Sequence, residues 1–207
     1  MADNKIKRLR NSAVIEFVEK KSLFIGFAEI VKSEEEALAI IKAKKKEYAD
    51  ATHNVYAYII GDDIARYSDD GEPQGTAGMP VLNSIRMAGI TDVLVVITRY
   101  FGGILLGAGG LVRAYSTAAS MALDAGGVAV FEPYIEMSIK CQYSDYGRVS
   151  TELGAFDVIL DNTVFEEEVS VDFAVREDIS TRLQEKICDA FCGRITPSIK
   201  GKRIDTK

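Results

Sequence analysis

Residues 93–115 read VLVVITRYFGGILLGAGGLVRAY and combine three local patterns that decide the fold. The apolar run Val93–Thr98 predicts a strand that is covered on both faces. A long helix is predicted from about Gly109 to Ala125, because apolar side chains recur there at helical spacing. A glycine-rich segment, Thr98–Tyr115, connects the strand to this helix. A doubly covered strand that leads into a helix indicates a sheet backed by helices.

The sequence before residue 93 predicts further strands and helices of the same domain. Ser33 is expected to begin a helix, since Glu36 three residues later completes a capping-box pattern. The other expected elements are an extended lead-in and a strand within residues 13–31, a strand at Asn54–Ile60, a partner strand at Ile64–Ser68 and a helix at about Val81–Ala88.

The composition changes after Asp124–Pro133, and this segment marks a domain boundary. We expect an N-terminal domain of residues 1–130 and a C-terminal domain of residues 131–207. The elements expected in the second domain are a strand at Tyr134–Cys141, a helix at about Tyr146–Leu153, strands at Ala155–Leu160 and Thr163–Val175, a helix at about Glu177–Phe191 and a strand at Arg194–Ile199. This βαββαβ order predicts a ferredoxin-like domain. The chain is therefore expected to be a two-domain α+β protein.

The composition is that of a globular protein, since 47% of the 207 residues are hydrophobic and 27% are charged. No run of about 18 apolar residues is present, so no membrane-spanning helix is predicted. Residues 1–12 include basic side chains without an apolar core after them, unlike a secretory signal. We therefore expect a soluble, cytoplasmic protein. The net charge of −6 argues against recruitment of nucleic acid by bulk electrostatics.

The chain has three cysteines, Cys141, Cys188 and Cys192. A disulfide framework needs more cysteines and an even number of them, so none is predicted. A zinc site needs about four ligands, and the single histidine, His53, is distant in sequence. We interpret the cysteines as buried structural thiols and expect neither a metal nor a cofactor. The acidic run Glu166–Glu168 is interpreted as the solvated start of a strand.

The first glycine-rich segment, Ser68–Pro80, reads SDDGEPQGTAGMP and predicts a shaped loop, because proline fixes φ and glycine permits unusual conformations. Thr76 is placed to cap the next helix. The acidic side chains of this loop have two interpretations. They can hold Mg²⁺, which prefers carboxylate oxygens, or they can make turn and cap hydrogen bonds and salt bridges. We favour the second interpretation for Asp69, Asp70 and Glu72, with Arg66 and Arg99 as the expected ion-pair partners.

The second glycine-rich segment, Thr98–Tyr115, has features of an anion site. Free N–H groups at a helix start attract anions, and Arg99 and Arg113 can add bidentate contacts. The segment is nevertheless not a P-loop, because no Gly-Lys-Ser/Thr follows it. It is not a dinucleotide fingerprint either, because Val112 occupies the position of the third glycine. Glycines that allow tight helix packing are the alternative explanation.

His53 is the only side chain whose unperturbed pKa lies near neutrality. A serine nucleophile acting with His53 and an aspartate is formally conceivable, but no Gly-x-Ser-x-Gly elbow is present. We favour a hydrogen-bonding role for His53 at the loop surface, and we name no catalytic residue.

Three strings resemble the YigZ/IMPACT family of conserved proteins along most of the chain. They are DATHNVYAY at Asp50–Tyr58, SDDGEPQGTAGMP at Ser68–Pro80 and TRYFGG…LGAGGLVRAY at Thr98–Tyr115. The resemblance implies a first domain similar to the second domain of a small-subunit ribosomal protein. It implies a second domain similar to the last domain of translocating elongation factors.

The eukaryotic members that this chain resembles regulate translation by competing for the activator of an initiation-factor kinase. The bacterial branch carries no settled biochemical role, and the sequence shows no metal-ligand set to support a peptidase. Two positions depart from the family pattern. Leu105 stands where the family usually has lysine, and Leu23 stands where it often has arginine. Both differences remove positive charge, and they favour a protein partner over nucleic acid.

Three functions are therefore considered for the glycine-rich face, by which we mean the surface formed by residues 68–80 and 98–115. The favoured one is a non-catalytic regulatory or binding protein associated with translation, with a protein or ribosome partner. The alternative is an enzyme acting on a small anionic or phosphorylated substrate, with His53 and the acidic loop at its site. RNA is a third candidate ligand, with Tyr56, Tyr58, Tyr100 and Phe101 as stacking platforms. The expected binding residues are His53, Asp69, Asp70, Glu72, Thr76, Arg99, Tyr100, Gly102, Gly103, Gly107, Gly109, Gly110 and Arg113.

Overall fold

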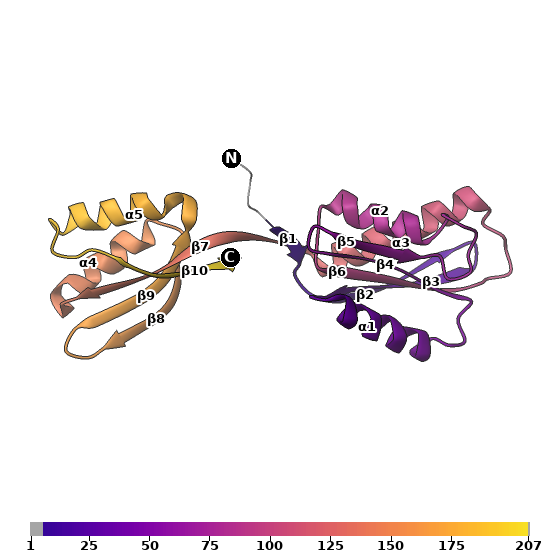
Figure 1. Cartoon of the computed structure of the whole chain (residues 1–207), viewed down its shortest axis with the longest axis horizontal. Coiled ribbons are helices and arrows are strands. Elements are labelled where there is room, and N and C mark those ends of the chain that lie inside the picture. The colour runs from indigo at the N-terminus through magenta and orange to yellow at the C-terminus, as the bar shows by residue number, and fades with distance from the viewer. Residues whose placement is uncertain (1–5, 207) are drawn as a thin grey trace. The chain divides into compact units, whose positions relative to one another are not determined.

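The computed structural model describes residues 6–206 (Figure 1). The chain divides into two compact units, one formed by Ile6–Val130 and the other beginning at Phe131. Each unit contains helices together with an antiparallel sheet. The predicted two-domain α+β fold is confirmed. No helix in the described part of the chain is long and apolar enough to cross a membrane.

The first unit is built on an antiparallel sheet with the strand order β2-β3-β6-β4-β5. Its strands are β2 (Ala13–Glu19), β3 (Ser22–Ile30), β4 (His53–Ile60), β5 (Ile64–Ser68) and β6 (Val93–Tyr100), and its helices are α1 (Glu34–Glu47), α2 (Gly78–Ala88) and α3 (Ala108–Gly126). Helix α1 covers one face of this sheet, and α2 and α3 cover the other (Figure 1). β6 is buried along almost its whole length, as the apolar run predicted.

Alternating side chains of β3 supply the two cores of this unit. Ile25 and Phe27 pack with the residues under α1, whereas Phe24 and Ala28 join the core formed with α2 and α3. Ser33 caps α1 as predicted, because its hydroxyl oxygen accepts a 3.2 Å hydrogen bond from the N–H of Glu36.

The hairpin between β2 and β3 was not predicted from the sequence. Its turn consists of Lys20 and Lys21, with φ of 45° and 66°. Tight hairpin turns of this kind usually contain glycine, asparagine or aspartate. Because this turn contains two lysines instead, the local sequence did not predict it. A short strand, β1 (Ile6–Leu9), was also missed. Leu9 of β1 packs into the core with α3.

The second unit has the connection order β7 (Val128–Cys141), α4 (Tyr143–Gly154), β8 (Ile159–Phe165), β9 (Val169–Arg176), α5 (Glu177–Ala190) and β10 (Ser198–Asp205). Within it the strands lie in the order β10-β7-β9-β8, and all neighbouring pairs are antiparallel. This is the predicted ferredoxin-like βαββαβ arrangement.

Strand boundaries in the second unit differ from the sequence prediction. The strands predicted at Ala155–Leu160 and Thr163–Val175 are β8 at Ile159–Phe165 and β9 at Val169–Arg176. Glu166–Glu168 is not the start of a strand but the turn between β8 and β9, where three adjacent carboxylates remain in solvent. The final strand begins at Ser198 rather than at Arg194. Pro197 directly precedes this strand and has no N–H to donate to a neighbouring strand. Pairing therefore begins only after Pro197.

The interpretation of all three cysteines as buried thiols was wrong for two of them. Cys141 of β7 is buried, and its burial raises the pKa of its thiol. Cys188 is partly exposed, and Cys192, which follows α5, is exposed. Cys192 follows Phe191, the C-terminal cap residue of α5, and has a positive φ of 51° in the turn that leaves the helix.

Candidate functional site

A row of three side chains crosses the first sheet on the face covered by α2 and α3. In the strand register, Arg99 of β6 lies between Phe24 of β3 and His53 of β4. Directly paired residues of neighbouring strands project from the same face. The ring of Phe24 meets Tyr115 of α3 edge-on, with 5.3 Å between the ring centroids. The register thus places His53 and Arg99 side by side, facing α3.

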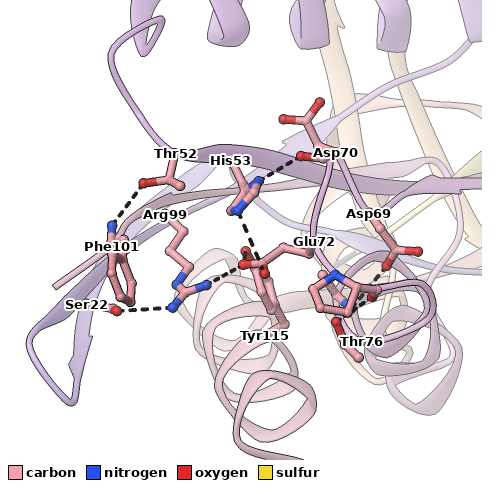
Figure 2. A network of polar contacts seen from close by, with 12 residues as sticks. Ser22, Thr52, His53, Asp69, Asp70, Glu72, Thr76, Arg99, Phe101 and Tyr115 are labelled. Carbon is pink, nitrogen blue, oxygen red and sulfur yellow. Dashed lines mark hydrogen bonds and ion pairs between the residues drawn. The ribbon is translucent and has the colours of Figure 1, made fainter. Parts of the chain in front are cut away.

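Glu72 reaches this row from the first glycine-rich segment and is buried together with Arg99. Its Oε1 lies 2.5 Å from Nη1 of Arg99 and accepts a 2.8 Å hydrogen bond from the hydroxyl of Tyr115. Nη2 of Arg99 donates to the hydroxyl of Ser22 at 3.3 Å (Figure 2). We call Ser22, His53, Glu72, Arg99 and Tyr115 the buried network.

The charges of the buried network satisfy one another. The carboxylate of Glu72 and the guanidinium of Arg99 form an ion pair in which both side chains are almost fully buried. Burial, followed by the charge of Glu72, raises the pKa of Tyr115, so its hydroxyl stays protonated and remains a donor. Removal of one partner from such a pair strongly destabilises the folded protein, because the other charge is left buried without compensation.

His53 joins the buried network with a defined ring orientation. Its Nδ1 lies 2.8 Å from the backbone carbonyl oxygen of Asp70, which can only accept a hydrogen bond. Nδ1 is therefore the protonated nitrogen, and Nε2 faces Glu72, with 3.8 Å between Nε2 and Oε2. His53 thus ties the first glycine-rich segment to the start of β4 (Figure 2).

Asp69, not Thr76, caps α2. Oδ1 of Asp69 accepts hydrogen bonds from the N–H groups of Ala77 and Gly78, at 3.1 and 2.8 Å. The hydroxyl of Thr76 instead donates to the carbonyl of Pro73 at 2.6 Å. The predicted cap was wrong because a carboxylate from several residues upstream occupies the capping position, which local spacing does not reveal.

Asp70 holds the first glycine-rich segment against β4 and α1. Its Oδ2 accepts a 2.6 Å hydrogen bond from the N–H of Asn54, and its Oδ1 pairs with Lys45. The acidic side chains of this loop therefore make cap hydrogen bonds, turn hydrogen bonds and ion pairs, as favoured from the sequence for Asp69, Asp70 and Glu72. Arg66, an expected partner of this loop, lies instead near Glu34. Within residues 6–206, no group of three or more His, Cys, Asp or Glu side chains is arranged to hold a metal ion.

Gly102 allows the second glycine-rich segment to lie directly against the hairpin turn of β2 and β3. A Cβ atom at Gly102 would overlap the backbone carbonyl of Lys21. The N–H of Gly102 donates to the hydroxyl of Ser22 at 3.2 Å. This glycine is therefore required by a close backbone approach. Gly109, in the first turn of α3, differs from it, since a Cβ there would meet open space.

An open pocket of about 410 Å³ lies above the buried network. His53, Glu72 and Arg99 contribute to its floor, and Phe101, Leu105 and Leu106 contribute to its apolar wall. Leu105 is 83% exposed, which is unusual for a leucine. We call these three apolar residues the rim. The arrangement combines a closed polar floor with an open apolar edge.

The buried network and the pocket both lie within a segment that matches a known domain. Residues 20–123 match the Impact N-terminal domain. This chain belongs to the IMPACT family. Residues 139–194 match a domain of unknown function, DUF1949. Every residue of the buried network and of the rim thus belongs to the Impact N-terminal domain.

Bacterial relatives within the IMPACT family match most of the chain, and a eukaryotic relative matches a shorter part of it. IMPACT family member YvyE of Bacillus subtilis is 38% identical over 189 residues, which are 90% of this chain and 83% of that protein. IMPACT family member YigZ of Escherichia coli is 33% identical over 180 residues, 85% of this chain and 88% of that protein. The Protein IMPACT homolog of Dictyostelium discoideum is 42% identical over 96 residues, 43% of this chain and 27% of that protein.

A solved structure supports the fold of the whole chain. It is described as "Crystal structure of an hypothetical protein" and shares 29% sequence identity with this chain. The superposition has a TM-score of 0.60 and covers 94% of this chain and 96% of that chain.

The structure does not bring all the expected binding residues of this IMPACT-family chain together. Arg113 lines a separate pocket next to Lys20, and Tyr100 points to the α1 face, where its hydroxyl donates to Asp50 at 2.9 Å. Burial, followed by Asp50, raises the pKa of Tyr100. The aromatic side chains expected to form a stacking platform are divided, since Tyr56, Tyr58 and Tyr100 pack on the α1 face, whereas Phe101 lines the pocket.

Sequence reasoning missed Ser22, Tyr115 and the rim residue Leu106 as parts of this site. Tyr115 offered one signal, because a tyrosine in an otherwise apolar helix stripe needs a partner for its hydroxyl. Ser22 and Leu106 offered none, since their contribution depends on the unpredicted hairpin and on the path of the glycine-rich segment.

Proposed function

We propose that this chain is a non-catalytic binding protein associated with translation, and that its glycine-rich face docks a protein partner. The observation that carries the proposal is the contrast between the rim and the floor of the pocket. Leu105 and Phe101 are exposed to solvent, whereas the charges of Glu72 and Arg99 are buried and paired with each other. Exposed apolar side chains around a pocket are typical of a protein-docking surface.

The closed floor argues against a small phosphorylated ligand. A phosphate could engage Arg99 only by displacing Glu72, which would leave a carboxylate buried without its partner. Docking of an apolar side chain needs no such rearrangement. Covering a leucine such as Leu105 contributes about 1.5–3 kcal/mol.

Membership of the IMPACT family supports the link to translation, because the resemblance described above implies a regulatory role through protein competition. We place the function in the cytoplasm and assign docking to an N-terminal domain of residues 1–130. The C-terminal domain, residues 131–207, then serves as a separate ferredoxin-like module.

The variant Leu105→Asp tests the docking role. Because the side chain is 83% exposed, the variant should keep the melting temperature of the wild type while weakening partner recovery at least about tenfold. Affinity purification from lysate, with quantification of co-purified translation proteins and ribosomes, provides the measurement. Met87→Asp is the matched control, since Met87 is 89% exposed on α2 of the same domain. Equal recovery with both variants would contradict the proposal.

The enzyme alternative rests on two specific atoms. Nε2 of His53 has no N–H in the neutral ring, and Nε of Arg99 is buried without a hydrogen-bond partner in the described chain. A small anionic substrate in the pocket would place a hydroxyl group where it can donate to Nε2 of His53 and an anionic oxygen where it can accept from the N–H of Arg99 Nε. Saturating phosphate monoesters would then raise the melting temperature by linkage. Under the docking proposal the melting temperature stays unchanged.

A further inference from the structure

We propose that the glycine-rich face recognises an acidic–apolar peptide segment. One apolar side chain of the peptide occupies the pocket at the rim, and a neighbouring carboxylate lies between Lys20 and Arg113. This inference rests on the proposed docking function and names the chemistry of its partner.

A second pocket adjoins the first. It has a volume of about 230 Å³ and is lined by Lys20, Arg113, Gly110 and Leu106, among others. Leu106 also lines the first pocket, so the two pockets share this side chain. A short extended peptide can therefore fill both pockets with side chains close in its sequence.

The second pocket carries cations that have no charged partner within residues 6–206. Neither Lys20 nor Arg113 makes a hydrogen bond or ion pair through its side chain among the residues that the structure describes. Arg99 differs, because Glu72 already neutralises it. Glu19 is the one carboxylate that lines this pocket. The second glycine-rich segment, Thr98–Tyr115, contains no acidic residue, so the local charge is positive.

The hairpin turn holds Lys20 beside this pocket. Lys20 and Lys21 both have positive φ, a conformation that is unfavourable for non-glycine residues. Gly102 lets the backbone of the second glycine-rich segment approach this turn closely. The turn thus packs against the same segment that forms the rim, and the pockets lined by Lys20 and by Leu105 have Leu106 in common.

The occupant that fits both pockets is a peptide rather than RNA. The carboxylate complements Lys20 and Arg113, and the apolar side chain complements Phe101, Leu105 and Leu106. Single-stranded RNA relies on several aromatic side chains on one surface. Only Phe101 of the four expected platform residues lines this face.

Selection from a random peptide library displayed on phage tests the inference. The full chain is immobilised, and peptides that also bind Leu105→Asp are discarded. Enriched peptides are expected to combine a leucine, isoleucine, phenylalanine or methionine with a nearby aspartate or glutamate. One such peptide is then synthesised, and its affinity is measured by fluorescence polarisation.

Charge reversal at the second pocket provides the quantitative readout. Arg113→Glu should weaken the acidic peptide about tenfold or more, and replacing the acidic residue of the peptide by lysine should restore its binding to this variant. Arg86→Glu is the matched control, because Arg86 is exposed on α2 of the same domain and carries the same charge change. The affinity of the Arg86→Glu variant for the acidic peptide should stay close to that of the wild type.

The contradicting outcomes separate the two proposals. Enriched peptides without acidic residues, or equal effects of Arg113→Glu and Arg86→Glu, would overturn the acidic–apolar inference and leave the docking function intact. Absence of any peptide that depends on Leu105 would overturn the docking function itself. Binding of a single-stranded oligouridylate that depends on Arg113 and competes with the peptide would overturn the inference in favour of RNA.

Discussion

Glu72→Ala is expected to lower the free energy of unfolding by about 3–5 kcal/mol, the range for removal of one partner from a buried ion pair. The substitution leaves the guanidinium of Arg99 buried and also removes the acceptor of the Tyr115 hydroxyl. Both groups then lack compensation for their lost hydration. Urea denaturation followed by circular dichroism measures the change.

Two variants show whether this effect comes from the buried charge. Glu72→Gln keeps the length of the side chain and an acceptor for Tyr115, so it should retain part of the stability lost in Glu72→Ala. Glu47→Ala removes a carboxylate from the exposed pair with Lys44 on α1, where a change below about 1 kcal/mol is expected. If Glu72→Ala is no more destabilising than Glu47→Ala, Glu72 does not close the floor of the pocket.

Gly102→Ala is expected to destabilise the N-terminal domain by about 1–3 kcal/mol, the range for overpacking. The added methyl group overlaps the backbone carbonyl of Lys21, and a backbone atom cannot move away by a change of rotamer. Relief of the overlap must shift the hairpin turn or the second glycine-rich segment. The affinity for the acidic–apolar peptide should fall together with the stability.

Gly109→Ala is the matched control for this prediction, because a Cβ at Gly109 meets open space in the first turn of α3. Alanine in a helix is favoured over glycine by about 0.5–1 kcal/mol, so the control should be neutral or slightly stabilising. Equal unfolding midpoints for Gly102→Ala and Gly109→Ala would show that the close approach at Gly102 is not needed.

Local patterns predicted most of the fold, because they act over a few residues. The apolar run Val93–Thr98 predicted a doubly covered strand, and the capping-box pattern of Ser33 and Glu36 predicted the start of α1. The errors fall where the local signal is absent or misleading. Lys20–Lys21 turns without glycine or asparagine, and the run Glu166–Glu168 forms a turn where a strand was expected.

The candidate site depended on information that local patterns do not contain. The sequence marked His53, Glu72 and Arg99 as binding residues, but their mutual contact follows from the register of β4 on β6 and from the path of a loop. Asp69 capped α2 from several residues upstream, in place of Thr76. The division between a closed polar floor and an apolar rim emerged only from tertiary contacts.

Photocrosslinking from the rim tests the central claim most directly. A photoreactive phenylalanine analogue replaces Leu105 in one protein and Met87 in a control protein, since both positions are highly exposed. After irradiation in cells, position 105 should yield discrete crosslinks to a protein of the translation apparatus, and position 87 should not. Crosslinks that are equal at the two positions, or that form from position 105 only to RNA, would contradict a protein-docking function for the glycine-rich face.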